Sequence, residues 1–539
     1  AAGAGLERGT TGHACNGYRC AGGFCVVAAS GQFLTSARRL FRGVRNPLLT
    51  PTSEAPEHRK SSYVIRILSP LFLLLVAVSM PGIAVAGNAD SAALALDNVR
   101  LVDADRDRVS AARCVRIEGP QVVRIARSGA RACRRDATVI DLGGRFLLPG
   151  LIDMHAHLTL GPLEFKRERG KMVMVADADD DIAAHNARRL VGFGVTTIRN
   201  PGGDLAAAAR YKARLAAGEL TGPQSFDAGP VINSADMRGL ATGASSVADI
   251  QRIVAEQVAD GADWIKLYTG LSPRLLQAGI DAAHAHDRPA VAHLERIAWP
   301  DALDMGLDAI VHLMPISADL LDAEARTAWH RSARLGHFAF FEWWEHFDPD
   351  GPGADRVVAA FEQHRPVFDA TLVAFHAAFV QDQDNAYKGD ARRHAHPRLD
   401  ANWNDWFTFA LGWKAEDFKR ARAIWPKVQR MAVRLYATRA RVTVGTDMSN
   451  PWIAPGISLH REMQLLVEAG VPVSRVLVAA TANAADALGA SSRLGRIAPG
   501  FEADLLVLDA NPLTDVRNTR AIHAVGLDGH RQHVHAVQA

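Results

Sequence analysis

The stretch Phe146-Leu-Leu-Pro-Gly-Leu-Ile-Asp-Met-His-Ala-His157 decides the fold. An apolar run that ends in polar residues is typical of a parallel strand buried on both faces. Further apolar strands alternate with amphipathic helices downstream, in the segments 194–200, 224–232, 263–270, 289–295, 307–314, 366–375 and 441–448. This alternation predicts an α/β fold, a (β/α)8 TIM barrel over residues 148–490.

The two ends of the chain carry a different pattern. Residues 93–148 and the chain beyond Ala490 show short apolar strands separated by polar turns, without helical periodicity. We therefore expect residues 87–147 and 491–539 to form one small composite β-sandwich beside the barrel.

Aromatic residues concentrate in one stretch of the predicted barrel. Residues 315–440 hold seven of the ten Trp and eleven of the twenty Phe. We interpret this stretch as an insertion, either of extra helices packed on the barrel or of an aromatic lid over its mouth. Long excursions in such barrels fall on the loops that shape the site.

Charge is distributed unevenly along the 539 residues. The net charge is +3, but residues 1–62 hold eight Lys and Arg against three acidic residues, whereas residues 87–539 hold 52 against 55. The body of the protein thus has no basic surplus for nucleic-acid binding. With 48% hydrophobic and 22% charged residues, the composition also excludes a fibrous or largely disordered chain.

The apolar run Ile67–Met80 and the small residues Ala84-Val85-Ala86 predict a signal peptide over residues 63–86. We accordingly expect a periplasmic or secreted protein, with no stable membrane insertion after cleavage; an uncleaved anchor is the alternative. Residues 1–62 are interpreted as an extension that is either untranslated or disordered. The mature chain keeps only Cys114 and Cys133, which form a disulfide or remain two buried thiols.

Candidate ligands for a metal ion lie at the ends of the predicted strands. His155 and His157 are two residues apart on one strand, so both imidazoles point to the same side. Lys266, His293, His312 and Asp447 end the fourth, fifth, sixth and eighth strands. The carboxyl ends of barrel strands form the catalytic face, so these groups converge on one rim.

These motifs resemble the metal-dependent amidohydrolase superfamily, in its imidazolonepropionase-like and Xaa-Pro (Xaa-Arg) dipeptidase-like branch. The resemblance covers residues 93–528 and includes Leu148–His157, Gly194–Arg199, Gly261–Lys266, Val444–Asp447 and Gly495–Asp504. It implies a barrel with a β-sandwich partner and a site for two divalent metal ions.

Carried over by position, the resemblance implies that His155, His157 and Asp447 bind one metal, and that His293 and His312 bind the second. Lys266 would bridge both as a carbamate derived from carbon dioxide, because a bare ammonium has no acceptor for a cation. If Lys266 is unmodified, a salt bridge to a nearby carboxylate is the alternative.

The donor set favours zinc, which His and carboxylate ligands bind with an open position for water; manganese and iron remain open. Two such ions can bridge a hydroxide, and Asp447 is the expected catalytic acid–base residue. The expected reaction is hydrolysis of an amide of the dipeptide or N-acyl amino acid type. A mononuclear deaminase, a hydrolase of cyclic amides such as imidazolones, and a non-catalytic binding protein are the alternatives.

Contacts to the substrate are expected from three further residues. Arg238 and Tyr268 are candidates for holding a substrate carboxylate, and Trp452 for lining the pocket, although each also fits a scaffold role. The only partner we predict is a small-molecule substrate; a homo-oligomer is left open.

Overall fold

A computed structural model of the chain describes residues 93–168, 171–334, 336–405, 408–527 and 530–532. The predicted extension 1–62 and signal peptide 63–86 lie outside the described residues, so both stay predictions. Among the helices in the described ranges, none combines the length and apolar character needed to cross a membrane.

The apolar segments found in the sequence form short parallel strands in two sheets. One sheet has the order β11 (Gln224–Asp227), β10 (Val195–Asn200) and β7 (Leu151–Asp153). The second has the order β13 (Ala241–Gly243), β12 (Val231–Asn233), β14 (Ile265–Leu267), β15 (Ala290–Ala292), β16 (Ala309–Val311), β17 (Val367–Asp369) and β18 (Arg441–Thr443). Most of their residues are buried, as expected for strands covered on both faces.

Isolated contacts connect both edges of the three-stranded sheet to the seven-stranded sheet. Ala228 forms a parallel bridge with Trp264, and Ala156 forms one with Met448. The Met154 amide also donates to the Val444 carbonyl at 2.9 Å. The predicted alternation of parallel strands and helices is confirmed, whereas the continuous hydrogen-bonded ladder of a closed barrel is not found among the described strands.

Helices follow the strands and begin at side chains that cap them. The Asp179 carboxylate accepts from the amides of Asp181 and Ile182 at the start of α3, and Ser246 and Asp249 form a capping box on α5. The helices of this layer are α3 (Asp180–Gly192), α4 (Leu205–Ala216), α5 (Val247–Ala259), α6 (Pro273–Ala285), α7 (Trp299–Asp304), α10 (Pro352–His364), α15 (Trp425–Tyr436), α16 (Ile457–Ala469), α17 (Val473–Ala479) and α18 (Ala482–Ala487). In α5 the buried side chains Ile250, Ile253 and Val254 recur at helical spacing, so one face packs inward.

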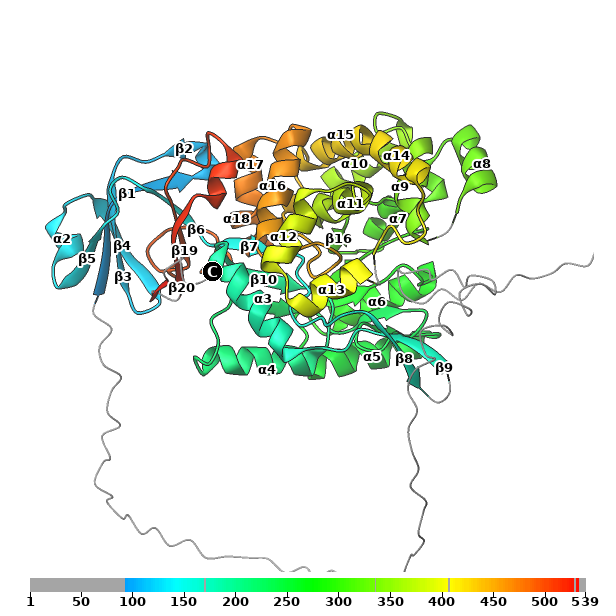
Figure 1. Cartoon of the computed structure of the whole chain (residues 1–539), viewed down its shortest axis with the longest axis horizontal. Coiled ribbons are helices and arrows are strands. Elements are labelled where there is room, and N and C mark those ends of the chain that lie inside the picture. Colours follow the sequence, from blue (N-terminus) through cyan, green and yellow to red (C-terminus); the bar gives the residue numbers. More distant parts are fainter. Residues whose placement is uncertain (1–92, 169–170, 335, 406–407, 528–529, 533–539) are drawn as a thin grey trace, which may run out of the picture. The chain divides into compact units, whose positions relative to one another are not determined.

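The two ends of the chain meet in one sheet, with β19 and β20 beside β6 in Figure 1. Its nine strands are β1 (Ala93–Asp103), β2 (Arg108–Val109), β3 (Arg113–Glu118), β4 (Gln121–Arg127), β5 (Ala137–Asp141), β6 (Phe146–Pro149), β19 (Leu505–Leu508), β20 (Ile522–Leu527) and β21 (His530–Gln532). The predicted association of the ends is therefore confirmed. The described strands are connected through β1, which pairs with β3 and β5 in its first half and with β6 in its second, and the sandwich arrangement stays a prediction.

Cys114 and Cys133 form a disulfide within this end sheet. Both cysteines are fully buried, and Cys114 lies on β3 while Cys133 lies on the short helix α2 (Arg131–Arg134). Of the two alternatives open from the sequence, the structure shows the disulfide.

The aromatic-rich stretch folds mainly into helices. They are α8 (Ala323–Ser332), α9 (Ala339–His346), α11 (Leu372–Phe379), α12 (Ala386–His394), α13 (Pro397–Asp405) and α14 (Ala415–Ala423), beside α10, β17 and α15 named above. Phe341, Trp343 and Trp344 are buried in the core, while Phe340 and Phe375 line a pocket. The two interpretations of this stretch, packed helices and a lid, both stay predictions. The remaining elements are the hairpin β8 (Glu164–Glu168) and β9 (Lys171–Val175) and the short turns η1 (Ala104–Arg106), η2 (Ala318–Leu320), η3 (Gly336–Phe338) and η4 (Val516–Arg520).

Candidate metal centre

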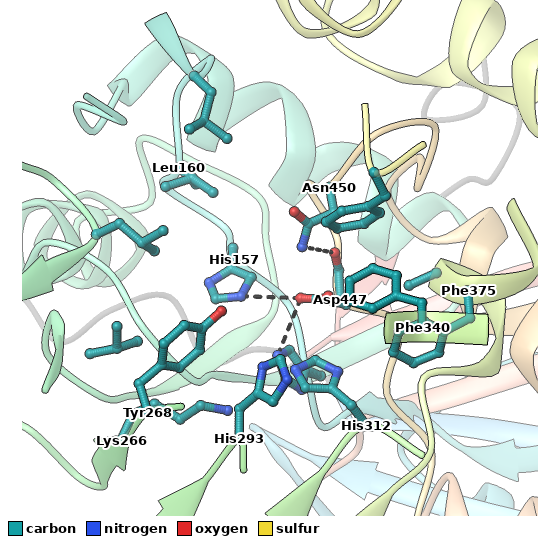
Figure 2. Close-up of a pocket in the computed structure, with 16 residues that line it drawn as sticks. His157, Leu160, Lys266, Tyr268, His293, His312, Phe340, Phe375, Asp447 and Asn450 are labelled. Carbon is teal, nitrogen blue, oxygen red and sulfur yellow. Dashed lines mark hydrogen bonds and ion pairs between the residues drawn. The ribbon is translucent and has the colours of Figure 1, made fainter. Parts of the chain in front are cut away.

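One cavity lies at the carboxyl ends of the parallel strands (Figure 2). Its empty volume is about 710 Å³, part of it open to solvent. The six residues predicted as metal ligands all line it: His155, His157, Lys266, His293, His312 and Asp447. The structure therefore brings together, in one place, groups that the sequence separates by almost 300 positions.

Three of these groups already have the arrangement of a metal site. Asp447 Oδ1 lies 3.3 Å from His155 Nε2 and 3.3 Å from His157 Nε2. Their candidate ligand atoms all lie within 4.8 Å of one another, and all three residues are buried. Burial disfavours the charged carboxylate, but the charges of His155 and His312 outweigh it and hold the pKa of Asp447 well below its ordinary value. Asp447 is thus an anion, as a ligand for a cation must be.

Three of the imidazoles are each oriented by a hydrogen bond at the Nδ1 atom. His155 Nδ1 lies 3.0 Å from Asp369 Oδ1, and His157 Nδ1 lies 2.8 Å from the Gly202 carbonyl oxygen. His312 Nδ1 lies 2.8 Å from Thr371 Oγ1. Because each Nδ1 is engaged, the Nε2 atom of each ring is the one available as a ligand, which is the usual arrangement of metal-binding histidines.

Lys266 and His293 behave differently from these anchored groups. Neither the Lys266 Nζ nor either ring nitrogen of His293 has a hydrogen-bond partner among the residues that the structure describes. The Glu295 carboxylate lies 3.9 Å from His293 Nε2, beyond hydrogen-bond distance. The salt bridge considered for Lys266 is thus not found in the described part of the chain.

Burial changes the protonation of both groups. Burial, with a contribution from the Arg199 charge, lowers the pKa of Lys266 to about 7. Burial and the Lys266 charge lower the pKa of His293 to about 3. Buried polar atoms without partners are rare in folded proteins. A neutral imidazole and an amine that loses its proton near pH 7, both beside three preformed ligands, fit a site that a divalent metal ion completes.

The backbone at the rim is held in a sparsely populated conformation. His312 has φ +65° and Asp447 has φ +64°, in the left-handed region that residues other than glycine rarely adopt. Such conformations cost roughly 1–3 kcal/mol each and persist where the surrounding structure fixes them. Two candidate ligands therefore sit on locally strained backbone.

A layer of buried charges beneath the ligands supports them. Arg199 donates to Asp369 Oδ2 at 2.7 Å and to the Met154 carbonyl at 2.8 Å. Asp153 accepts from the His155 amide at 3.0 Å and from the Thr446 hydroxyl at 2.7 Å, so it joins the loops that carry His155 and Asp447. These contacts connect the first, second, seventh and eighth predicted strands below the cavity.

Sequence reasoning missed Asp369, Thr371 and Asn450. Asp369 ends β17 as the other candidates end their strands, so its position carried a signal that the search for ligands overlooked. Asn450 lines the cavity and donates to the Asp447 carbonyl at 2.9 Å. Thr371 gives no such signal, because a lone Thr after a strand is common.

The three predicted substrate contacts lie in different surroundings. Tyr268 lines the cavity, with its ring centroid 5.0 Å from that of His293. Arg238 is half exposed and pairs with Asp177 through two bonds of 2.8 and 2.6 Å. Trp452 is buried beside Lys388, whose Nζ lies 5.5 Å from the ring centroid. Neither Arg238 nor Trp452 is among the described residues that line the cavity.

Comparisons with known proteins agree with this fold. The model of the amidohydrolase family matches residues 415–531. Ochratoxinase of Aspergillus niger is 37% identical over 102 residues, which is 17% of this chain and 20% of that protein. The matched part therefore spans about a fifth of this relative's length.

Solved structures match over a larger part of the chain. A Xaa-Pro dipeptidase with methionine bound in its active site has a TM-score of 0.59 and 19% identity, over 82% of this chain and 100% of that one. The structure of A. niger ochratoxinase has a TM-score of 0.56 and 16% identity, over 82% and 96%. The family model thus matches about a fifth of the chain, and the solved structures show a shared fold over most of it.

Proposed function

We propose that the chain is a metal-dependent hydrolase of carbon–nitrogen bonds that cleaves an amide. One observation carries the proposal: six potential ligands surround a single cavity. Three of them are already assembled, and two are buried without a hydrogen-bond partner among the described residues. The structural likeness to a dipeptidase and the local likeness to ochratoxinase support it.

The six residues would divide between two ions. His155, His157 and Asp447 would hold one divalent ion, His293 and His312 the second, and Lys266 would lie between them as a carbamate. Zinc suits this donor set of imidazole and carboxylate. A neutral amine is the form that reacts with carbon dioxide, and the lowered pKa of Lys266 supplies that form near neutral pH. The bound ions would supply Lewis acidity and lower the pKa of water.

Asp447 is the group that would move the proton. Its carboxylate lies in the cavity and is held ionised, so it can accept a proton from the attacking water and pass it to the leaving nitrogen. Tyr268 lies across the cavity beside His293, where its hydroxyl group could bind the substrate.

The side chains that line the cavity indicate which kind of substrate it would bind. Leu160, Leu163, Val231 and Leu240 contribute aliphatic surface, and Phe340, Phe375 and Phe409 contribute aromatic surface. Figure 2 shows Phe340 and Phe375 on one side of Asp447, with Leu160 and Tyr268 on the other. We propose a dipeptide or N-acyl amino acid with a bulky apolar acyl group, because apolar walls favour apolar groups.

Two structural proposals go with this function. The bridges at both edges of the three-stranded sheet support a closed eight-strand barrel formed by β7, β10, β11 and β14–β18. The disulfide supports export through the predicted signal peptide, since disulfides persist in oxidising compartments. Fractionation of cells, with sequencing of the mature N-terminus, tests export; retention of residues 63–86 in the cytoplasm would contradict it.

Asp447→Asn tests the proposed mechanism. Asparagine keeps the shape of the side chain but cannot act as a base, so we expect kcat to fall by about 10²–10⁴. Metal content by mass spectrometry and hydrolysis of a library of dipeptides and N-acyl amino acids are the measurements. Unchanged activity in the variant would refute the role of Asp447, and one ion per chain would favour the mononuclear alternative.

A further inference from the structure

One short segment after β17 contacts two of the anchored histidines. It runs from Asp369, the last residue of β17, to Phe375 in the first turns of α11; we call it the strand-seven segment. Asp369 Oδ1 lies 3.0 Å from His155 Nδ1, and Thr371 Oγ1 lies 2.8 Å from His312 Nδ1. Asp369 and Thr371 are both fully buried.

We propose that the strand-seven segment positions the metal centre: Asp369 and Thr371 orient His155 and His312, one histidine of each proposed metal ion. This inference rests on the proposed function. Neither residue is offered as a ligand or as a catalytic residue, because each reaches the cavity only through the ring of a histidine. A hydrogen bond at Nδ1 fixes the orientation of an imidazole, and loss of such a bond typically costs 10–100-fold in metal affinity.

The segment is itself held rigidly at both ends. Arg199 donates to Asp369 Oδ2 at 2.7 Å, with both side chains fully buried. At the other end, the Glu462 carboxylate of α16 accepts from the amides of Leu372 and Val373 at 2.9 and 2.6 Å. Thr371 between them has φ +47°, so its hydroxyl is presented from a constrained backbone.

The same segment reaches the substrate side of the cavity. Ala374 and Phe375, three and four residues after Thr371, line the cavity wall. The Phe375 ring centroid lies 6.2 Å from that of His312 and 5.5 Å from that of Phe340. One rigid segment therefore fixes two proposed ligands and one aromatic wall, so a change in its position would alter metal binding and substrate binding together.

The chain contains a matched control for Thr371. His460 Nδ1 lies 2.8 Å from Thr519 Oγ1, and both residues are buried, but neither lines the cavity. Thr371→Val and Thr519→Val each remove a hydrogen bond between a threonine and the Nδ1 of a buried histidine, one behind a proposed ligand and one elsewhere; Thr519→Val also removes the bond from Thr519 to the Val516 carbonyl. Thr371→Ser keeps the hydroxyl and serves as the rescue variant.

The experiment measures zinc affinity by competition with a chromophoric chelator, and the absorption spectrum of the cobalt-substituted protein. We expect Thr371→Val to weaken binding of one of two ions by 10–100-fold and to change the cobalt spectrum. Thr371→Ser should restore both, and Asp369→Asn should weaken the other ion. Thr519→Val should bind metal like the unmodified protein even if its Tm falls.

Two results would overturn the inference. Thr371→Val could keep the unmodified affinity and spectrum, or Thr519→Val could lose metal to the same extent, which would make the effect one of general stability. Failure of the proposed function looks different, because the unmodified protein would then bind no metal or would bind it without hydrolysing any amide.

Discussion

The two kinds of nitrogen around the cavity differ in what holds them. His155, His157 and His312 are each anchored at Nδ1 by a protein group, and His155 and His157 also approach Asp447. Lys266 and His293 are equally buried but have no hydrogen-bond partner among the described residues. The anchored groups are parts of the folded protein's own network. Lys266 and His293 make no hydrogen bond within that network of described residues, so a bound group such as a metal ion has to satisfy them.

This comparison separates stability from metal binding. Removing an anchored group should damage the metal-free fold, since a buried partner loses its bond. Removing an unpartnered group should leave the metal-free fold intact or improve it, since an unsatisfied buried polar group is unfavourable. Both kinds of substitution should weaken metal binding.

The largest contrast is expected between His155→Asn and His293→Asn. In the first, Asp369 loses its bond to the ring at a fully buried position, so we expect the metal-free protein to lose about 2–3 kcal/mol. In the second, no described hydrogen bond is lost, so the change should stay below about 1 kcal/mol. Denaturant unfolding of the protein treated with a chelator measures both.

Equal losses of unfolding free energy in the metal-free His155→Asn and His293→Asn variants would contradict the distinction between anchored and unpartnered groups. Unfolding in the presence of zinc is the matched control, because both variants should then gain less stability from the metal than the unmodified protein does.

Lys266→Met should have the next largest effect on the metal-free protein, and this substitution should stabilise it rather than destabilise it. The folded-state pKa of Lys266 is about 7, against 10.5 for the exposed side chain. Below pH 7 the folded protein must hold a buried ammonium, so the penalty is fully present there and fades as the pH rises towards 10.5. We therefore expect the metal-free variant to be more stable by a few kcal/mol at pH 7, with a smaller gain at pH 9.5.

Chemical unfolding of the metal-free protein at both pH values checks this sign. A variant that is less stable at pH 7, or a gain that grows with pH, would show that Lys266 has a partner in solution. With metal present, the same variant should bind fewer than two ions.

The sequence predicted the six groups that line the cavity, but not the residues that support them. Strand ends are visible as apolar runs followed by polar residues, so His155, His157, Lys266, His293, His312 and Asp447 could be found, and the structure brings all six to one cavity. Asp369 shares this position, but its role depends on a contact with His155, which lies 214 positions away in the sequence. Thr371 depends on a backbone turn with φ +47°, which no residue pattern reveals.

The limits of the fold prediction have a similar cause. Alternation of strands and helices is a local pattern and was predicted correctly, as was the meeting of the two chain ends. How strands close or split into sheets depends on backbone pairing between distant segments. The split between β11 and β14, joined by a single bridge at Ala228 and Trp264, is such a feature. The interpretation of Arg238 as a substrate contact also lacked a tertiary fact, the ion pair with Asp177.

The smallest effect is expected from substitution of Arg238. Unlike Lys266, Arg238 is a cation that has an ion-pair partner in the structure. It pairs with Asp177, which also binds Lys166 at 2.8 Å, and the two basic side chains lower the pKa of Asp177 to about 2, with Arg238 contributing most. Arg238→Gln leaves Lys166 to pair with Asp177 at this exposed position. Since exposed ion pairs contribute roughly 0–1 kcal/mol, we expect less than about a threefold change in KM and no change in metal content.

Steady-state kinetics on an amide with a free carboxylate and on its uncharged counterpart measures this change in KM. A selective rise in KM of tenfold or more for the carboxylate substrate would show that Arg238 leaves Asp177 to bind it, and would restore the role expected from the sequence.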